Sequence, residues 1–214
     1  MVTLGETGKS DPRQFENKRK LFLVPMLPTT LDFESNTTEL LDSHWEQIKN
    51  QLDNLEKSLG TIKHVFHEML HLEDEPGMQL LSQISPRSQL LTKKIVDSSA
   101  NLHATENADL LYEMMDLQRC LSVGLISQRI HTELSDNFSK TSNSRNLHIS
   151  DTIDSKLLVN EIGLLFISED HKIQFASDIQ VFYVSPPSFN KIKQALEDYS
   201  QHVESAVDDS KEIT

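Results

Sequence analysis

The sequence predicts an α/β fold in which a single mixed β-sheet of about four to five strands is covered by several helices. Two short apolar runs, KLFLVPML (20–27) and IQVFYV (179–184), lie near opposite ends of the chain and have the length and composition of buried strands. The longer segments between them carry apolar residues at helical spacing, so we expect more helix than strand. An α+β arrangement of the same elements is the alternative.

The clearest helix lies between a capping-box sequence, NTTE (36–39), and Gly60, which suits a left-handed position at a helix C-terminus. Its apolar residues recur at spacings of three and four: Leu41, Trp45, Ile48, Leu52, Leu55 and Leu59. Such a stripe favours a helix that covers a sheet. The alternative is a homodimer that forms a coiled coil through the 37–59 helix, although roughly three heptads are few for a coiled coil.

Helical spacing of apolar residues marks four further segments: 78–84, 88–96, 105–140 and the end of the chain from Ser188. Gly124 is expected to kink or split the longest of them. A polar loop, SKTSNSRN (139–146), follows as the best candidate for a mobile segment, before a helix around 151–162. The next run, GLLFISEDHKIQF (163–175), has the pattern of a hairpin.

Length and composition are those of one globular domain, with 214 residues, 37% hydrophobic and 25% charged. We expect a flexible N-terminal arm (1–17), a globular domain (18–203) and an acidic flexible tail (204–214). The single cysteine, Cys120, excludes an internal disulfide and fits a reducing compartment, so a cytoplasmic location is expected.

The formal net charge of −13 limits the classes of partner. Nucleic acids and anionic membrane surfaces attract basic proteins, so neither is expected to bind this chain. No apolar run approaches the ~20 residues that a membrane helix needs. A protein partner or a small molecule is therefore the expected ligand.

Residues 67–71 read HEMLH, which has the form of a zinc-hydrolase signature and resembles metallopeptidase motifs over these five residues. On a helix, His67 and His71 would stand on one face and could bind one Zn²⁺, with Glu68 as the general base. The carboxylate-rich segment ENADLLYEMMD (106–116) offers Glu113 as a third ligand. Zinc is the one cofactor that the sequence suggests.

The same segment can also be a strand, and we favour this interpretation. A buried strand followed by a helix that ends at Gly60 should lead into a second parallel strand, at TIKHVFHEML (61–70). On a strand His67 and Glu68 point to opposite sides of the sheet, which excludes the zinc arrangement. His67, Glu68 and His71 would then lie at a strand end beside Pro25–Leu27, where they could line a pocket as polar or acid–base groups.

No complete catalytic or nucleotide-binding motif is present. The sequence therefore favours a non-catalytic cytosolic protein that binds a protein partner or a small regulatory ligand through a sheet edge or helix face. One alternative is a zinc-dependent hydrolase that uses residues 67–71. A second is a small α/β enzyme whose strand-end histidines act as acid and base.

Overall fold

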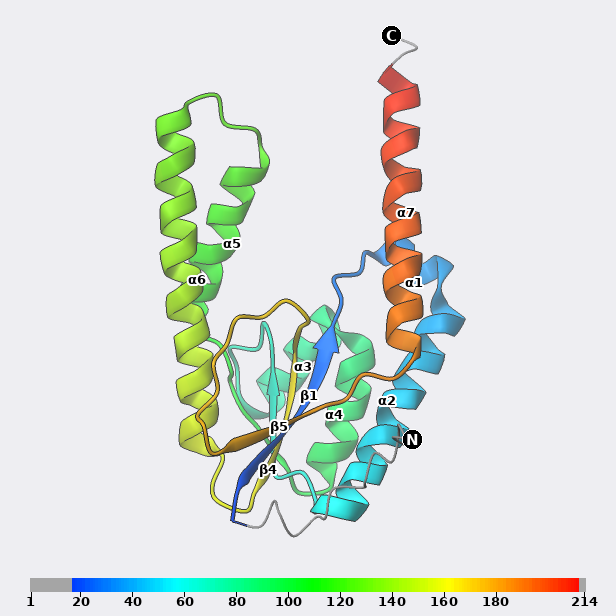
Figure 1. The fold of residues 1–214 in the computed structure, drawn as a ribbon, viewed down its shortest axis with the longest axis vertical. Coiled ribbons are helices and arrows are strands. Elements are labelled where there is room, and N and C mark those ends of the chain that lie inside the picture. The colour runs from blue at the N-terminus through cyan, green and yellow to red at the C-terminus, as the bar shows by residue number, and fades with distance from the viewer. Residues whose placement is uncertain (1–16, 212–214) are drawn as a thin grey trace, which may run out of the picture.

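The computed structural model describes the backbone of residues 17–211 and the side chains of residues 17–30 and 32–202. Within this part the chain forms one five-stranded parallel sheet, in the order β3-β2-β4-β1-β5, and seven helices (Figure 1). The elements in chain order are β1 (Arg19–Met26), α1 (Leu31–Asn36), α2 (Thr38–Leu59), β2 (His64–His67), α3 (Asp74–Ile84), α4 (Pro86–Asp97), β3 (Asn101–Leu102), α5 (Ala108–Ser122), α6 (Gln128–Lys156), β4 (Ile162–Ser168), β5 (Ile179–Tyr183) and α7 (Ser188–Lys211). The predicted α/β class, with a single sheet and more helix than strand, is confirmed.

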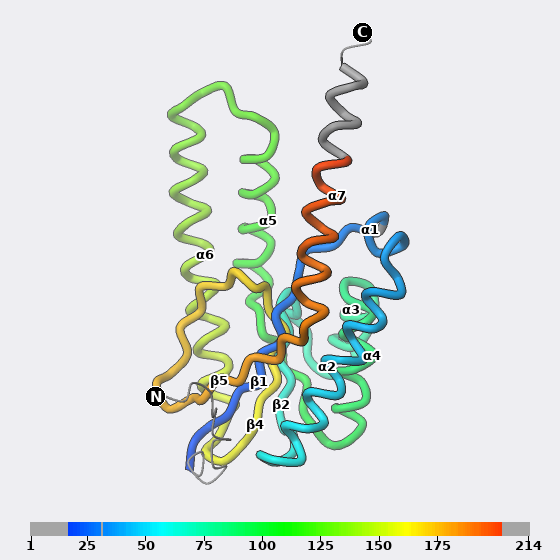
Figure 2. The backbone as a smooth tube through the Cα atoms, turned by 45° about the vertical axis from the view of Figure 1, so that its right-hand side comes forward, coloured from blue at the N-terminus to red at the C-terminus, as the bar shows by residue number. Residues whose placement is uncertain are grey.

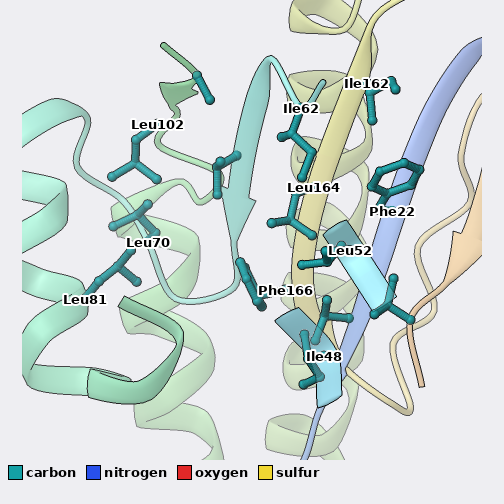
Figure 3. Close-up of a cluster of buried hydrophobic side chains, with 14 of the residues drawn as sticks. Phe22, Ile48, Leu52, Ile62, Leu70, Leu81, Leu102, Ile162, Leu164 and Phe166 are labelled. Carbon is teal, nitrogen blue, oxygen red and sulfur yellow. The ribbon is translucent and has the colours of Figure 1, made fainter. Parts of the chain in front are cut away.

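Helices cover both faces of the sheet, and two cores result. On β1, Phe22 and Val24 point into the core under α2, α3 and α4, part of which is shown in Figure 3, whereas Leu21 and Leu23 point into the core under α6. Because the central strands are buried on both faces, they read as continuous apolar runs rather than as alternating patterns.

The apolar stripe of α2 lies against the sheet, as predicted. Ile48 and Leu52 are buried beside Phe166 of β4 (Figure 3). The stripe therefore packs within the chain, and the homodimer through the 37–59 helix stays a prediction. Gly60 ends α2 with a φ of 115°, the positive value expected at that position.

The sheet is parallel throughout, not mixed, because the hairpin expected at 163–175 does not form. The chain leaves β4 at Ser168, returns without a helix to the amino edge of the sheet, and then enters β5. Ile173 anchors this return segment in the core under α6. A run of apolar residues cannot show whether such a segment pairs with its neighbour or only packs on it.

The polar loop expected at 139–146 is part of α6 instead. Thr141 and Arg145 are buried there, and Arg145 makes ion pairs that tie the helix to the rest of the molecule. Tertiary contacts thus outweigh the weak helix propensity of the serines and asparagines. The capping box expected at 36–39 is also not formed, since Thr30 caps the short helix α1 and Thr37 makes no side-chain cap.

Two projections rise from the carboxyl edge of the sheet, as Figures 1 and 2 both show. One is the hairpin of α5 and α6, which Gly124 divides with a φ of 71°, as expected. The other is α7, whose first part packs against α1 and α2 through Phe33, Leu41 and Ile192. No helix in the described part of the chain has both the length and the apolar character needed to cross a bilayer. Of the arm expected at 1–17 and the tail expected at 204–214, residues 1–16 and 212–214 lie outside the described residues.

Candidate functional site

A pocket of about 680 Å³ lies at the carboxyl ends of β1, β2 and β4. The connection that leaves β1 leads toward β2, and the one that leaves β4 leads toward β5 in the opposite direction. At such a switch point the connecting segments diverge, which leaves a crevice outside the strand ends where α/β proteins bind ligands. The fold therefore places the pocket where a ligand site is expected.

One wall of the pocket is apolar. Trp45 and Leu41 of α2 line it together with Phe189 and Ile192 of α7 and Met26 at the end of β1. Trp45, the single tryptophan of the chain, has its ring centroid 6.1 Å from that of Phe166. Trp45 is predicted only as part of a packing stripe, but it also lines the pocket.

His67 lies at the end of β2 and points toward α4. Its Nδ1 is 2.6 Å from the carbonyl oxygen of Glu68, and its Nε2 is 2.8 Å from Oγ of Ser88. Because a carbonyl only accepts, Nδ1 carries the proton and Nε2 accepts from the Ser88 hydroxyl. Burial lowers the pKa of His67 to about 4, so the ring is neutral at neutral pH. A further contact of 2.6 Å joins the hydroxyls of Ser88 and Ser85, and Ser85 lines the pocket.

Glu68, the next residue, points toward α6. Its carboxylate accepts from Nη2 of Arg145 at 2.9 Å and from the backbone N–H of Ser168 at 2.7 Å, and it also accepts from the Ser168 hydroxyl. Burial opposes the ionisation of Glu68, but the bonds from Ser168 and Arg145 outweigh it and hold its pKa below the usual value. Arg145 also pairs with Glu106, whose side chain is 0% exposed. The floor of the pocket thus rests on a buried cluster of two carboxylates and one guanidinium.

Ion pairs flank the mouth of the pocket. Arg87 of α4 contacts Glu34 at 2.5 Å and Asp42 at 3.1 Å, and thereby joins α4 to α1 and α2. On the other side Lys193 of α7 contacts both carboxylate oxygens of Glu169, at 2.8 and 2.9 Å. The mouth is therefore lined by charges, whereas the wall behind it is apolar.

The structure does not bring the proposed zinc ligands together. Residues 64–67 form a strand, which confirms the favoured interpretation and sends His67 and Glu68 to opposite faces of the sheet. His71 lies beyond the strand, with Nε2 3.0 Å from the hydroxyl of Tyr112, and Glu113 is exposed on α5. Among the described residues no group of three or more His, Cys, Asp or Glu side chains could hold a metal ion. The zinc arrangement of His67, His71 and Glu113 with Glu68 as base is thus not formed, because a strand period replaces the helical one.

Several residues of the site gave no signal in the sequence. Glu106 lies in the carboxylate-rich segment 106–116, where nothing in the sequence distinguishes it, but it is buried against Arg145. Arg145 itself lies in a polar run that predicted a loop, and Ser88 lies in an ordinary amphipathic helix. A charged residue at the buried face of a helix can be found only when the helix register is known.

Protein-family models, curated proteins and solved structures were each compared with this chain, and none of them matches it. The geometry of the pocket is therefore the basis for inferring a function.

Proposed function

We propose that this protein is a non-catalytic binding protein of the cytoplasm, and that its ligand inserts an apolar group into the pocket at the carboxyl edge of the sheet. The observation that carries the proposal is the pocket itself, with a volume of about 680 Å³ and an apolar wall formed by Trp45, Leu41, Phe189 and Ile192. A volume of ~300–1,000 Å³ with mostly apolar lining and a few placed polar groups is typical of small-ligand sites. The free cysteine, Cys120, supports the cytoplasmic location.

The state of His67 supports binding over acid–base catalysis. Both of its ring nitrogens are engaged, one by the Glu68 carbonyl and the other by Ser88. A general base works best when its pKa lies near the operating pH, and the pKa of about 4 leaves His67 a weak base at neutral pH. His67 is thus better suited to position Ser88 and the end of β2 than to abstract a proton.

Trp45 provides a direct test, because its emission reports on the pocket alone. Octan-1-ol is titrated into the protein while Trp45 emission is recorded, and we expect a saturable shift to shorter wavelength as water leaves the indole. Ile84 lines the mouth with 43% of its surface exposed, so Ile84→Asp should weaken binding without unfolding the chain. Leu90→Asp is the matched control, since Leu90 is 63% exposed and does not line the pocket. A response that does not saturate, or one that both variants change equally, would contradict the proposal.

A second candidate function rests on the hydrogen-bond chain from Ser85 through Ser88 to His67. Such a chain could carry a proton from the Ser85 hydroxyl to His67 and make Ser85 a nucleophile. A fluorophosphonate that labels Ser85 covalently, and fails to label the His67→Gln variant, would favour this enzyme over the binding protein.

A further inference from the structure

We infer that the ligand group carries a positive charge, so that the pocket takes an apolar moiety bearing an ammonium or guanidinium. This inference rests on the proposed function and names the chemical class of the ligand. It follows from the charged groups that surround the pocket and from the contacts that Lys193 makes beside its mouth.

The first cluster at the mouth has an excess of negative charge. Arg87 is the one lysine or arginine among the described residues that line the pocket, and its guanidinium is shared by two carboxylates, Glu34 and Asp42. One negative charge therefore remains uncompensated here. An anionic ligand would have to displace these carboxylates from Arg87 before it could use the guanidinium.

The floor and the far side of the mouth add to this excess. Glu68 and Glu106 share the single charge of Arg145, which leaves another negative charge beside the strand ends. Asp170 lines the mouth as well, and no Lys, Arg or His in the described part of the chain lies within ion-pair distance of it. Both clusters and Asp170 therefore favour a cation and oppose an anion.

The histidines of the pocket do not offset these charges. His44 is buried with Nδ1 2.9 Å from the hydroxyl of Ser188, and burial lowers its pKa to about 4. His67 has a pKa lowered by burial to about 4 as well. Both rings are neutral at neutral pH, so the negative excess persists under physiological conditions.

Lys193 shows how the mouth holds an ammonium. Its Nζ lies 2.8 and 2.9 Å from the carboxylate oxygens of Glu169 and 6.0 Å from the centre of the Phe189 ring. Phe189 also lines the pocket, as Trp45 does. Carboxylate and aromatic face together are the surroundings in which ammonium and guanidinium groups bind. A ligand cation can bind beside this pair at Asp170, which lines the pocket and has no ion-pair partner among the described residues, while its apolar part covers the wall.

Two kinds of ligand carry a cation on an apolar group: a free aliphatic amine, and a lysine or arginine side chain of a protein partner. Three octyl probes with different head groups test the charge: octylamine, octan-1-ol and octanoate, each titrated against Trp45 emission. Octylamine is protonated at neutral pH, as lysine is. Two capped dipeptides, acetyl-Leu-Lys-amide and acetyl-Leu-Glu-amide, test the source.

We expect octylamine to bind at least about tenfold more tightly than octanoate at low salt, and the ratio to shrink when salt screens the charges. Ile84→Lys should weaken octylamine binding and Ile84→Glu should strengthen it, whereas Leu90→Lys should change neither probe. A lysine dipeptide that binds more tightly than octylamine would assign a protein partner, and weaker binding would assign a free amine.

Two other outcomes separate this inference from the proposed function. If octan-1-ol binds saturably but octanoate binds as tightly as octylamine, the inferred positive charge of the ligand is wrong, and the proposed binding function stands. If none of the three octyl probes gives a saturable change, both fail. An octylamine preference that Ile84→Lys leaves unchanged would also overturn the inference, because the mouth would then not be its origin.

Discussion

His67 and Glu68 are consecutive in the chain but belong to opposite faces of the sheet. Nε2 of His67 lies 2.8 Å from Ser88 on the α4 side, whereas Oε1 of Glu68 lies 2.9 Å from Arg145 on the α6 side. The strand thus places His67 of the HEMLH sequence in a neutral hydrogen-bond chain and Glu68 in a buried ion cluster. The two meet again at the carboxyl edge, where both residues line the pocket.

The first prediction concerns metal content. Protein purified without a histidine tag should hold less than ~0.1 equivalent of zinc after incubation with the metal and desalting, because no three-ligand set is formed. Treatment with EDTA should leave the midpoint of thermal unfolding unchanged. One equivalent of zinc that both His67→Ala and His71→Ala abolish would contradict the structure.

The second prediction concerns the buried ion cluster. Arg145→Met should lower the free energy of unfolding by about 3–5 kcal/mol at pH 7, because it leaves two carboxylates buried without a cation. The side chains of Arg145 and Glu106 are 9% and 0% exposed. Arg119→Met is the control, since Arg119 and its partner Asp116 are 71% and 73% exposed and such surface pairs contribute about 0–1 kcal/mol. Urea denaturation of both variants should give clearly different losses, and equal small losses would show that the cluster is solvated.

The third prediction concerns acid. His44, His67 and His103 each have a pKa lowered to about 4 in the folded chain, chiefly by burial, against an ordinary value of 6.5. The unfolded chain therefore takes up protons below pH 6.5 that the folded chain does not, so stability is full above that pH and is lost as the pH falls toward 4. For His67 alone the slope approaches about 1.4 kcal/mol per pH unit.

Urea denaturation at steps from about pH 7 to pH 5, above the range in which carboxylates titrate, measures this slope. His67→Gln should reduce this slope by up to about 1.4 kcal/mol per pH unit, the contribution of one proton, although the variant is less stable at every pH. His131→Gln, at an exposed position on α6, should leave the slope unchanged. A wild-type slope near zero over this range would show that the three histidines are charged or solvated in the folded chain.

The fourth prediction concerns Gly77 in α3. Exchanging glycine for alanine inside a helix normally stabilises it by about 1 kcal/mol. Here a Cβ atom would lie 2.4 Å from the carbonyl oxygen of Leu72, so Gly77→Ala should destabilise the chain by about 1–3 kcal/mol instead. Ser82→Ala, at an exposed position of the same helix, should be neutral or slightly stabilising. A gain in the thermal midpoint for Gly77→Ala would contradict the close contact at the start of α3.

The parts of the fold that periodicity controls were predictable from the sequence. The continuous apolar run of β1 has to be buried on both faces, and the apolar stripe of α2 has to face the core. Gly60 marks the end of α2 because the backbone there needs a positive φ. The strand at 64–67 was predicted from its position after that helix rather than from its own residues. The carboxyl edge was thus predictable as the place of a ligand site.

The polar interior of the site was not predictable in the same way. Arg145 lies 77 residues from Glu68 and 39 from Glu106, and no local pattern encodes a pairing over such separations. The polar run 139–146 has low helix propensity, yet it lies in α6, where Arg145 pairs with those distant carboxylates. The return segment after β4 likewise gives no sign of its path, because Ile173 packs on the sheet without pairing to it.

The most direct test of the pocket as the binding site is an intermolecular NOE experiment with octylamine and the labelled protein. We expect NOEs from the methylene chain to the indole of Trp45 and the ring of Phe189, with the end nearest nitrogen closest to the Glu169 side of the mouth. NOEs to the exposed tip of the hairpin at Val123 and Ile126, with none to Trp45, would contradict the assignment and move the binding surface to the projection formed by α5 and α6.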